Sequence, residues 1–326
     1  MNRVSVIIPI YNVSRFIERC ADSLMRQTLN EVEYIFVNDA TPDNSMELLR
    51  GVIARYPARA AQVKIVEHEH NKGLPAARNT GLVAATGEYI FHCDSDDYVE
   101  PDMLEHLYNA AKEKDADIVW CDWFLTFARN ERYMKQPSFD TSMEAVKAML
   151  SGAMKFTVWN KLVRRSLYID NNIEYPAGYG MGEDMTTIML FACAKNIVYV
   201  PKALYHYVKL NTSAYTQTYS PRHIIDLQHN VKRVADFLKG RFGDRLDAET
   251  AYLKLDVKFP YLISPDKDNY RIWQTMYPEA NAYIGKNKSI SMRSRLLQWC
   301  ACKKLYFVLK LHYFLLHKVV YGMIYK

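Results

Sequence analysis

Three aspartates lie within four residues in the stretch FHCDSDDYVEP, at Asp94, Asp96 and Asp97. Two like charges about 4 Å apart repel each other by roughly 4 kcal/mol near a protein surface, so such a cluster needs compensation. A divalent cation such as Mg²⁺ or Mn²⁺ would provide it, because these ions prefer oxygen ligands and often share them with substrate phosphates. The alternative is that the carboxylates face water or cap a helix that begins at Pro101. The stretch alone leaves both open.

A second acidic pair, Glu183 and Asp184, precedes the apolar segment 185–194, which predicts a helix. A carboxylate in this place could act as a general base that removes a proton from a hydroxyl group. Acidic residues are also favoured at any helix N-terminus, so a structural explanation is equally good.

The elements that must position these residues alternate along the first part of the chain. Segments rich in β-branched residues predict strands, and amphipathic segments predict helices between them. The predicted strands are 4–10, 33–38, 63–68, 89–93 and 117–123, and the predicted helices are 14–27, capped by Ser14, 45–55, 74–85 and 101–114. This alternation is typical of a parallel sheet covered by helices on both faces. Ligands then lie beyond the carboxyl ends of the strands, which is where Asp94 falls.

The other strand ends bring polar residues to the same edge, in Pro9-Ile-Tyr11-Asn12, Asp39-Ala-Thr-Pro-Asp43 and Asn71-Lys72-Gly73-Leu-Pro-Ala-Ala-Arg78-Asn79-Thr-Gly81. Tyr11 could pack beside a base, Asp39 could accept a hydrogen bond from a base N–H, and Arg78 could neutralise a diphosphate. Each has a structural alternative: Tyr11 could end a strand, Arg78 could lie on a solvated helix face, and Asp43 is interpreted as a helix cap.

With these segments in this order, the sequence resembles a family 2 glycosyltransferase of the GT-A fold. The motifs of that family read like P-x-Y-N, D-G-S-x-D, N-x-G-x-x-x-A-R-N-x-G and D-x-D-D. The likeness continues through Trp159-Asn-Lys161, Gly182-Glu-Asp184 and Tyr205-His-Tyr207, and it covers roughly residues 4–215. It implies an α/β fold with a Rossmann-like, mostly parallel sheet flanked by helices, and the rest of the chain predicts a helical C-terminal extension. Ala40 stands where the family more often has glycine, so the turn there need not take a positive φ.

The resemblance implies a role for each matched residue. Contacts to the nucleotide sugar would come from Pro9, Tyr11, Asp39, Lys72, Arg78, Asp94 and Ser95, the ligands of Mn²⁺ or Mg²⁺ would be Asp96 and Asp94, and the catalytic base would be Asp184, with Glu183 as its neighbour or alternate. Asp97 would orient the metal ligands. Trp159 and His206 are candidate contacts to the acceptor or the diphosphate, although Trp159 and Tyr179 are equally explained as core aromatics and a lone histidine is more often structural.

The function that the resemblance implies is metal-dependent, inverting transfer of a hexosyl or N-acetylhexosaminyl group. The donor would be a nucleoside-diphosphate sugar, with UDP expected, and the acceptor a hydroxyl of a growing surface glycan, which a lipid could carry. A nucleotidyltransferase would need a glycine-rich triphosphate loop after the first strand, and a dehydrogenase would need GxGxxG there; Pro9-Ile-Tyr11-Asn12 is neither. The other alternative is a catalytically inactive relative that serves as a membrane-associated assembly partner.

Charge is distributed unevenly along the 326 residues. The net charge is +6, but residues 280–326 contain nine Lys and Arg and no Asp or Glu, so the preceding residues carry −3. From 296 to 325 the pattern is helical, with cations on one half and apolar residues on most of the other. This pattern suits an interfacial helix on an anionic membrane, and a helix docked on the catalytic domain is the alternative. Nucleic-acid binding is not expected, because the basicity is confined to the tail.

The cysteines and apolar segments bear on location. Six cysteines without a CxxC pair indicate reduced thiols, no apolar stretch reaches the roughly 18 residues of a membrane span, and the N-terminal segment is too strand-like for a signal peptide. We therefore expect a cytoplasmic protein, peripheral on the inner face of the cell membrane. Its predicted parts are a nucleotide-sugar-binding half (1–124), an acceptor-binding half with the acidic motif (125–215) and a helical extension with the basic tail (216–326).

Overall fold

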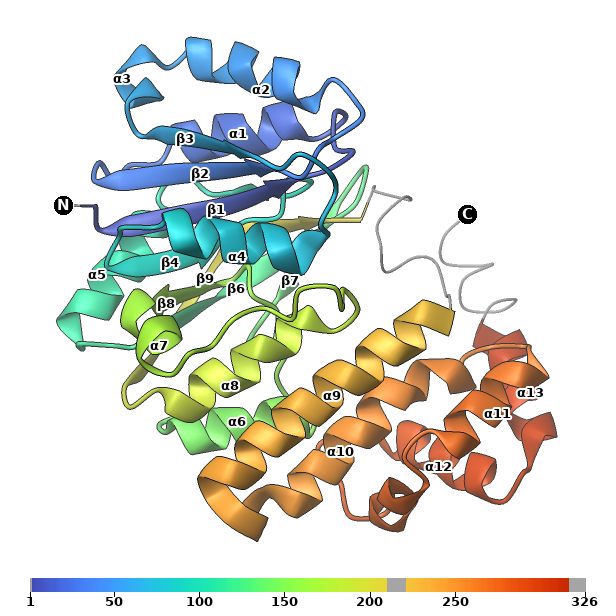
Figure 1. The fold of residues 1–326 in the computed structure, drawn as a ribbon. Coiled ribbons are helices and arrows are strands. Elements are labelled where there is room, and N and C mark those ends of the chain that lie inside the picture. The colour runs from blue at the N-terminus through green and yellow to red at the C-terminus, as the bar shows by residue number, and fades with distance from the viewer. Residues whose placement is uncertain (1, 210–220, 317–326) are drawn as a thin grey trace. The chain divides into compact units, whose positions relative to one another are not determined.

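The computed structural model describes residues 2–209 and 221–316. The chain forms two compact units, the first of Met1–Ala145 with Phe156–Val234 and the second of Val146–Lys155 with Ala235–Lys326. All strands of the described part belong to the first unit (Figure 1). The predicted division at residues 124 and 215 is a functional one and stays a prediction.

The first unit is built on a nine-stranded mixed sheet. Its strands are β1 (Val4–Ile10), β2 (Val32–Asn38), β3 (Val63–Glu67), β4 (Tyr89–His92), β5 (Tyr98–Val99), β6 (Ile118–Thr126), β7 (Glu131–Met134), β8 (Lys161–Arg164) and β9 (Ile197–Val208). They lie in the order β3, β2, β1, β4, β8, β6, β9, β5, and β7 pairs with β6.

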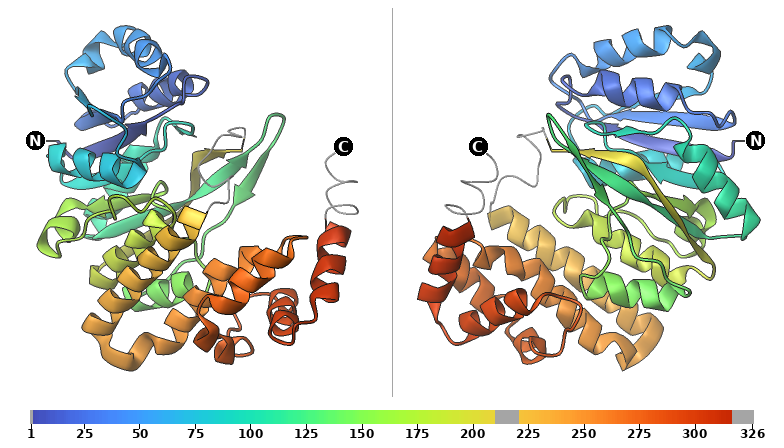
Figure 2. Two further views of the ribbon diagram at one scale, coloured as in Figure 1. Left: turned by 45° about the vertical axis from the view of Figure 1, so that its right-hand side comes forward. Right: turned by 180° about the vertical axis from the view of Figure 1, so that it is seen from behind.

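Half of the strand pairs are parallel. β1 pairs in parallel with β2 and β4, and β2 with β3, as the alternation predicted. Every residue of β1 is buried, which agrees with the apolar character of all its residues except Ser5. The second half of the sheet differs, because β8 runs antiparallel between β4 and β6 and therefore separates the fourth and fifth predicted strands. The view from behind in Figure 2 shows β6 beside β7, its antiparallel partner, and β9, its parallel partner.

The helices that begin in this unit are α1 (Ile17–Met25), α2 (Ser45–Ala54), α3 (Pro57–Ala60), α4 (Leu74–Ala84), α5 (Met103–Glu113), α6 (Ser142–Leu150), α7 (Arg165–Asp170), α8 (Thr186–Cys193) and α9 (Pro221–Phe242). The predicted helices are confirmed to within three residues at each end. The predicted cap of α1 is wrong: α1 begins after Phe16, and the backbone N–H of Ser14 instead donates to Asp43. The N-cap residue of α2 is Asn44, and Asp43, one residue before it, accepts from the backbone N–H of Ser45 at 3.2 Å.

The regular elements among the described residues of the second unit are all helices. They include α10 (Asp247–Lys258), α11 (Lys267–Thr275), α12 (Met292–Cys302), α13 (Tyr306–Leu315) and the 3₁₀ turns η3 (Gly243–Leu246), η4 (Phe259–Leu262) and η5 (Pro278–Tyr283). The tail pattern predicted as helical from 296 is interrupted between α12 and α13, where Lys304 has a φ of 56°. The rest of that pattern, 317–325, lies outside the described residues. None of the described helices combines the length and the apolar character that crossing a membrane requires.

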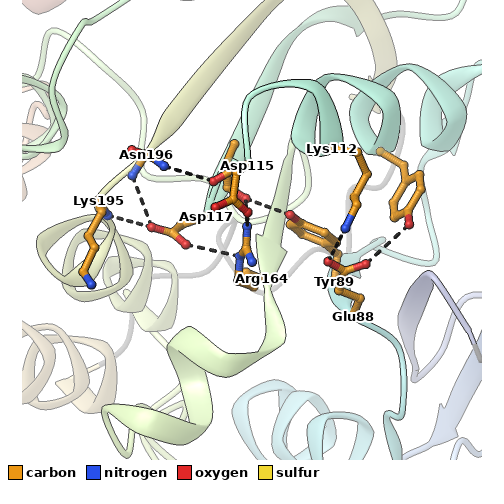
Figure 3. A network of polar contacts seen from close by, with 10 residues as sticks. Glu88, Tyr89, Lys112, Asp115, Asp117, Arg164, Lys195 and Asn196 are labelled. Atoms are coloured by element: carbon orange, nitrogen blue, oxygen red, sulfur yellow. Dashed lines mark hydrogen bonds and ion pairs between the residues drawn. The ribbon is translucent and has the colours of Figure 1, made fainter.

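A polar network ties the amino ends of β4 and β6 to the end of β8 (Figure 3). Arg164 forms ion pairs with Asp115 at 2.6 Å and with Asp117 at 3.2 Å. Asp117 also accepts from the backbone N–H groups of Lys195 and Asn196. This network lies at the edge of the sheet opposite the carboxyl ends of β1, β2 and β4, and we interpret it as structural.

Candidate active site

The carboxyl ends of β1, β2 and β4 meet at one edge of the sheet. Ile10 pairs with Asn38 in the β1–β2 register, and Ile7 pairs with His92 in the β1–β4 register. Asp39 and Asp94, which follow β2 and β4, are therefore brought to the same edge, as the sequence predicted.

Asp39 is buried and fixed by three donors. Its carboxylate contacts Nδ1 of His68 at 2.7 Å and accepts from the backbone N–H groups of Lys72 and Gly73, both at 2.8 Å. His68 in turn contacts the hydroxyl of Thr80 on α4 through Nε2 at 2.8 Å. Asp39 thus organises the loop between β3 and α4, and the ammonium group of Lys72 is left on an exposed side chain.

The turn after β2 lies against the end of β1. Tyr11 is 48% exposed, whereas Pro9 is buried within β1. The hydroxyl of Thr41 accepts from the backbone N–H of Asn12 at 2.8 Å and donates to Asp43 at 2.7 Å. Although glycine is absent, the turn does take a positive φ at Ala40, of 53°. The turn keeps the left-handed backbone typical of glycine, and these hydrogen bonds hold it there despite the Cβ.

The acidic loop after β4 divides its three carboxylates between two environments. Asp97 is buried, and its oxygens accept from the hydroxyl of Tyr205 and from the backbone N–H of Val208, both at 2.7 Å. Burial, together with the charges of Asp96 and Asp94, raises the pKa of Asp97 well above its usual range. Asp94 and Asp96 are only partly buried. The role of Asp97 in orienting the metal ligands stays a prediction, and Ser95 is buried as well.

Arg78 of α4 joins the two acidic segments. Its side chain is 1% exposed, and Nη2 lies 3.0 Å from Asp94, 3.9 Å from Asp184 and 4.0 Å from Glu183. Burial alone would lower the pKa of this guanidinium, but the three carboxylates raise it above its usual value. The alternative of a solvated Arg78 is wrong. Nε and Nη1 are buried without a hydrogen-bond partner among the described residues, which is unusual for such strong donors.

Glu183 and Asp184 lie in the 3₁₀ turn η1 (Glu183–Met185), directly before α8. Burial raises the pKa of Asp184 to about 6, against the opposing effect of Arg78. Burial and the charge of Asp184 raise the pKa of Glu183 well above its usual range. Lys161, wholly buried in β8, also acts on Asp184, and burial lowers the pKa of this lysine to about 7.

Two predicted contact residues are occupied elsewhere. Trp159 is 4% exposed and stacks on Tyr205 and Tyr207, with ring centroids 4.6 and 5.3 Å apart. The two ring nitrogens of His206 contact Glu131 at 2.8 Å and Glu100 at 2.9 Å. These contacts fit the core and structural alternatives, so the structure does not present either side chain to an acceptor or a diphosphate.

The donor set at the acidic loop fits a divalent cation that shares its ligands with a substrate. Among residues 2–209 and 221–316, no three His, Cys, Asp or Glu side chains gather into a group that could hold a metal by themselves. Asp94 and Asp96 are carboxylates at a partly open edge, and Mg²⁺ or Mn²⁺ commonly takes one or two carboxylates and completes its shell with phosphate oxygens.

Sequence reasoning missed three residues that shape this site. His68 was assigned to the third strand without a role, although its place at the strand end was a usable signal. Lys161 and Tyr205 belong to motifs quoted above. Their spacing gave no sign that Lys161 interacts electrostatically with Asp184 or that Tyr205 donates a hydrogen bond to Asp97.

Comparisons with known proteins agree with this architecture. The model of glycosyl transferase family 2 matches residues 5–178, more than half of the chain. The uncharacterized glycosyltransferase EpsJ of Bacillus subtilis is 34% identical over 67% of this chain and 64% of its own length, so the match spans a little under two thirds of that relative. The cholesterol galactosyltransferase of Borreliella burgdorferi is 30% identical over 80% of this chain and 74% of its own length.

Solved structures show the same fold. S. aureus TarS 1–349 in complex with UDP-GlcNAc superposes with a TM-score of 0.71 at 19% identity, over 95% of this chain and 91% of that one. The mannosyltransferase PcManGT from Pyrobaculum calidifontis, in complex with GDP-Man and Mn²⁺, gives a TM-score of 0.55 at 19% identity. The match covers 94% of this chain and 83% of that one. The predicted GT-A fold is confirmed. The family model that matches more than half of the chain, together with the likeness to the Borreliella burgdorferi protein over 74% of its length, shows that this chain belongs to glycosyl transferase family 2.

Proposed function

We propose that the protein is a metal-dependent, inverting glycosyltransferase that moves a sugar from a nucleoside-diphosphate sugar to a hydroxyl of a growing surface glycan. One observation carries this proposal: a single buried guanidinium, that of Arg78, lies within 4.0 Å of Asp94, Glu183 and Asp184. Asp94, which is suited to bind a metal, and Asp184, which is suited to act as a base, therefore contact the same guanidinium group.

Asp184 is the proposed base. Its side chain is 27% exposed, so an acceptor hydroxyl could reach part of it, whereas its Oδ1 is buried without a hydrogen-bond partner among the described residues. With a pKa of about 6 it is ionised at neutral pH and yet a stronger base than an ordinary aspartate. Glu183 is 12% exposed and stays the neighbour or alternate.

The donor would lie along the strand ends, with its base near Pro9, Tyr11 and Asp39. We propose Asp94 and Asp96 as ligands of Mn²⁺ or Mg²⁺, which when bound would stabilise the negative charge of the leaving diphosphate. The exposed Lys72 is better placed than Arg78 to reach that diphosphate, because Arg78 is already buried among carboxylates. Support comes from TarS, solved with UDP-GlcNAc, and from PcManGT, solved with GDP-Man and Mn²⁺; UDP is the nucleotide that we propose.

We also propose that the acceptor is lipid-linked and that the protein works on the inner face of the cell membrane. Exposed apolar residues follow helical spacing on two helices of the second unit: Met292, Leu296 and Trp299 on α12, and Phe307, Leu311 and Phe314 on α13. The exposed lysines Lys303, Lys304 and Lys310 accompany them, and no acidic residue occurs from 280 onward. One relative is named for galactosyl transfer to cholesterol, a membrane lipid.

The proposed function is tested with two variants and a panel of UDP-, GDP- and dTDP-sugars, with and without Mn²⁺. Thermal shift measures donor binding, because a ligand that binds only the native form raises the melting temperature. Asp96→Ala should lose both turnover and metal-dependent donor binding. Asp184→Asn should lower turnover by about 10²-fold or more, as removal of a general base does, and should keep donor binding.

Normal turnover by Asp184→Asn would remove the assignment of the base. Metal-independent binding and transfer would contradict the metal site. If no nucleotide sugar shifts the melting temperature and none is hydrolysed, the inactive assembly partner becomes the better description.

A further inference from the structure

The segment that leads into the proposed base is rich in glycine. Gly178, Gly180 and Gly182 occur within five residues, and Gly178 and Gly182 have φ values of 83° and 87°. The segment lies outside helices and strands until η1 begins at Glu183. Glycine gives a backbone great conformational freedom, whereas a catalytic base must be held within a fraction of an ångström. Something outside this segment must therefore fix it.

Two buried side chains of α9 bind the backbone of this segment. Oδ2 of Asp226 accepts from the N–H of Gly180 at 3.1 Å and lies 3.5 Å from the nitrogen of Met181. Nδ2 of Asn230 donates to the carbonyl of Tyr179 at 3.2 Å and to that of Met181 at 2.9 Å. Both side chains are 1% exposed, although Asp and Asn are among the residues most often found in water. Their polar groups are directed at three consecutive backbone units just before the base.

Further contacts secure both ends of the segment. At one end, Arg222 donates to the carbonyl of Gly178 at 2.7 Å and pairs with Asp226 at 2.9 Å. At the other end, Arg233 donates to the hydroxyl of Thr186, at the start of α8, at 3.0 Å. The ring of His229 stacks on Tyr179 with a centroid separation of 3.6 Å. Successive turns of α9 thus follow the segment from Gly178 to Thr186.

Gly182 itself is packed closely. A Cβ at this position would lie 3.0 Å from Cε of Met185 and 3.3 Å from Cδ1 of Leu227, another residue of α9. The close approach and the positive φ together explain why the residue directly before the acidic pair is glycine.

We infer that Asp226 and Asn230 are positioning residues for the Glu183–Asp184 base: they fix the preceding backbone and take no part in the chemistry themselves. This inference rests on the proposed function for its catalytic part, while the anchoring of the segment can be measured without any substrate. The sequence pattern did not indicate these contacts, because the two side chains lie 45 to 51 residues along the chain from the backbone groups that they bind.

The test compares variants by steady-state kinetics, melting temperature and amide hydrogen exchange of the peptide that covers residues 177–186. Asn230→Ala removes two hydrogen bonds without changing a charge. We expect it to lower kcat at least tenfold, to leave the donor KM within twofold, and to speed exchange in this peptide while exchange in β1 to β4 is unchanged. Asp226→Ala should do the same, and Asp226→Asn, which keeps an acceptor oxygen, should recover most of kcat.

Asp236→Ala is the matched control, because Asp236 is an aspartate of the same helix that is exposed rather than buried and lies ten residues beyond Asp226. It should leave kcat and exchange unchanged. If Asn230→Ala keeps both kcat and slow exchange, the inference is overturned. Faster exchange with an unchanged kcat would refute the catalytic part. If the wild-type protein transfers no sugar although exchange rises in the variants, the anchoring stands and the proposed function fails instead.

Discussion

Arg78 shows how burial changes the meaning of a residue. In the sequence it reads as a cation for a diphosphate or as part of a solvated helix face. In the structure it is 1% exposed and surrounded by carboxylates from segments about ninety residues apart in the chain. A buried guanidinium is tolerated only when charged partners compensate its lost hydration. Arg78 therefore links the acidic loop to the proposed base through ion pairs and is not an unpaired cation available to a ligand.

Replacing Arg78 should destabilise the fold. Arg78→Met leaves Asp94, Glu183 and Asp184 without their shared cation, and breaking a buried charge pair typically costs about 3–5 kcal/mol. The measurement is urea denaturation at pH 8 and pH 5. The loss of unfolding free energy should be smaller at pH 5. Burial raises the pKa values of Glu183 and Asp184, and once these two carboxyls are protonated they no longer need a neighbouring cation. Arg50→Met is the control: Arg50 is 59% exposed and pairs with an exposed Glu67, so it should cost less than about 1 kcal/mol. Equal losses for the two variants would show that Arg78 is not the hub that we describe.

The pKa of Asp184 predicts the pH dependence of turnover. A base works only when deprotonated, and burial raises this pKa to about 6. At saturating metal, kcat/KM should therefore rise with pH through about 6 and level off above it. The rising part of this pH profile reports the Glu183–Asp184 pair together, since the two groups interact. A limb near pH 4, the value of an ordinary aspartate, would contradict a buried base.

At the scale of elements, close packing of α4 against β1 places Arg78 and the acidic loop. Gly81 makes this contact possible, because a Cβ there would lie 2.3 Å from Cγ2 of Ile7. The turn after β2 shows the reverse case. Ala40 accepts a left-handed φ of 53°, so a loop anchored by Thr41 and Asp43 keeps its shape without the glycine. In both cases the backbone conformation or packing is set by neighbouring residues, Ile7 for Gly81 and Thr41 for Ala40, and not by the local sequence preference.

Two glycine-to-alanine substitutions in helices should have opposite effects. Gly51 lies on the exposed side of α2 with nothing within 4 Å of an added Cβ, so Gly51→Ala should stabilise the protein by about 0.5–1 kcal/mol. Gly81→Ala in α4 should destabilise it by about 1–3 kcal/mol or more, because the methyl group has no space beside Ile7. Thermal or urea unfolding of both variants measures the difference. Stabilisation by Gly81→Ala would mean that α4 does not pack on β1 as described.

At the scale of the whole molecule, the chain divides its work between two units. The first holds all strands of the described part and all the site residues discussed above. The second unit includes the acid-free tail, where exposed apolar stripes on α12 and α13 occur beside lysines. Large exposed apolar surfaces on a protein usually mark a site of interaction. The absence of negative charge makes an anionic lipid surface the partner that we propose.

The membrane proposal is tested by co-sedimentation of the protein with phosphatidylglycerol vesicles. A triple variant, Phe307→Ser with Leu311→Ser and Phe314→Ser, should lower binding at least tenfold. Lys303→Gln with Lys310→Gln should lower it about 30-fold, since each lysine near an anionic surface contributes about 1 kcal/mol.

Val83→Ser and Ile169→Ser are the controls, because both residues are exposed apolar side chains outside the tail, at 88% and 56%. They should bind vesicles as the wild type does. Equal binding of phosphatidylcholine vesicles would remove the electrostatic part of the proposal. Unchanged binding by both tail variants would place the contact elsewhere.

Periodicity and motif order determined much of this protein from sequence alone. The four parallel strands, their helices and the meeting of Asp39 with Asp94 at one edge follow from alternation, since parallel strands bring their carboxyl ends together. The family also followed, because its motifs are local in the sequence. These features depend on residues near each other in the chain, or on a rule of topology.

Only the tertiary structure decided which groups are buried and which distant groups meet. The insertion of β8 between β4 and β6, the burial of Trp159, His206 and Arg78, and the contacts of Asp226 and Asn230 with the segment before the base all depend on packing across long stretches of chain. Burial sets the pKa of Asp184 and the pairing of Arg78, because charge is costly away from water. A sequence pattern carries the identity of a side chain, but its solvent exposure and its partners exist only once the chain has folded.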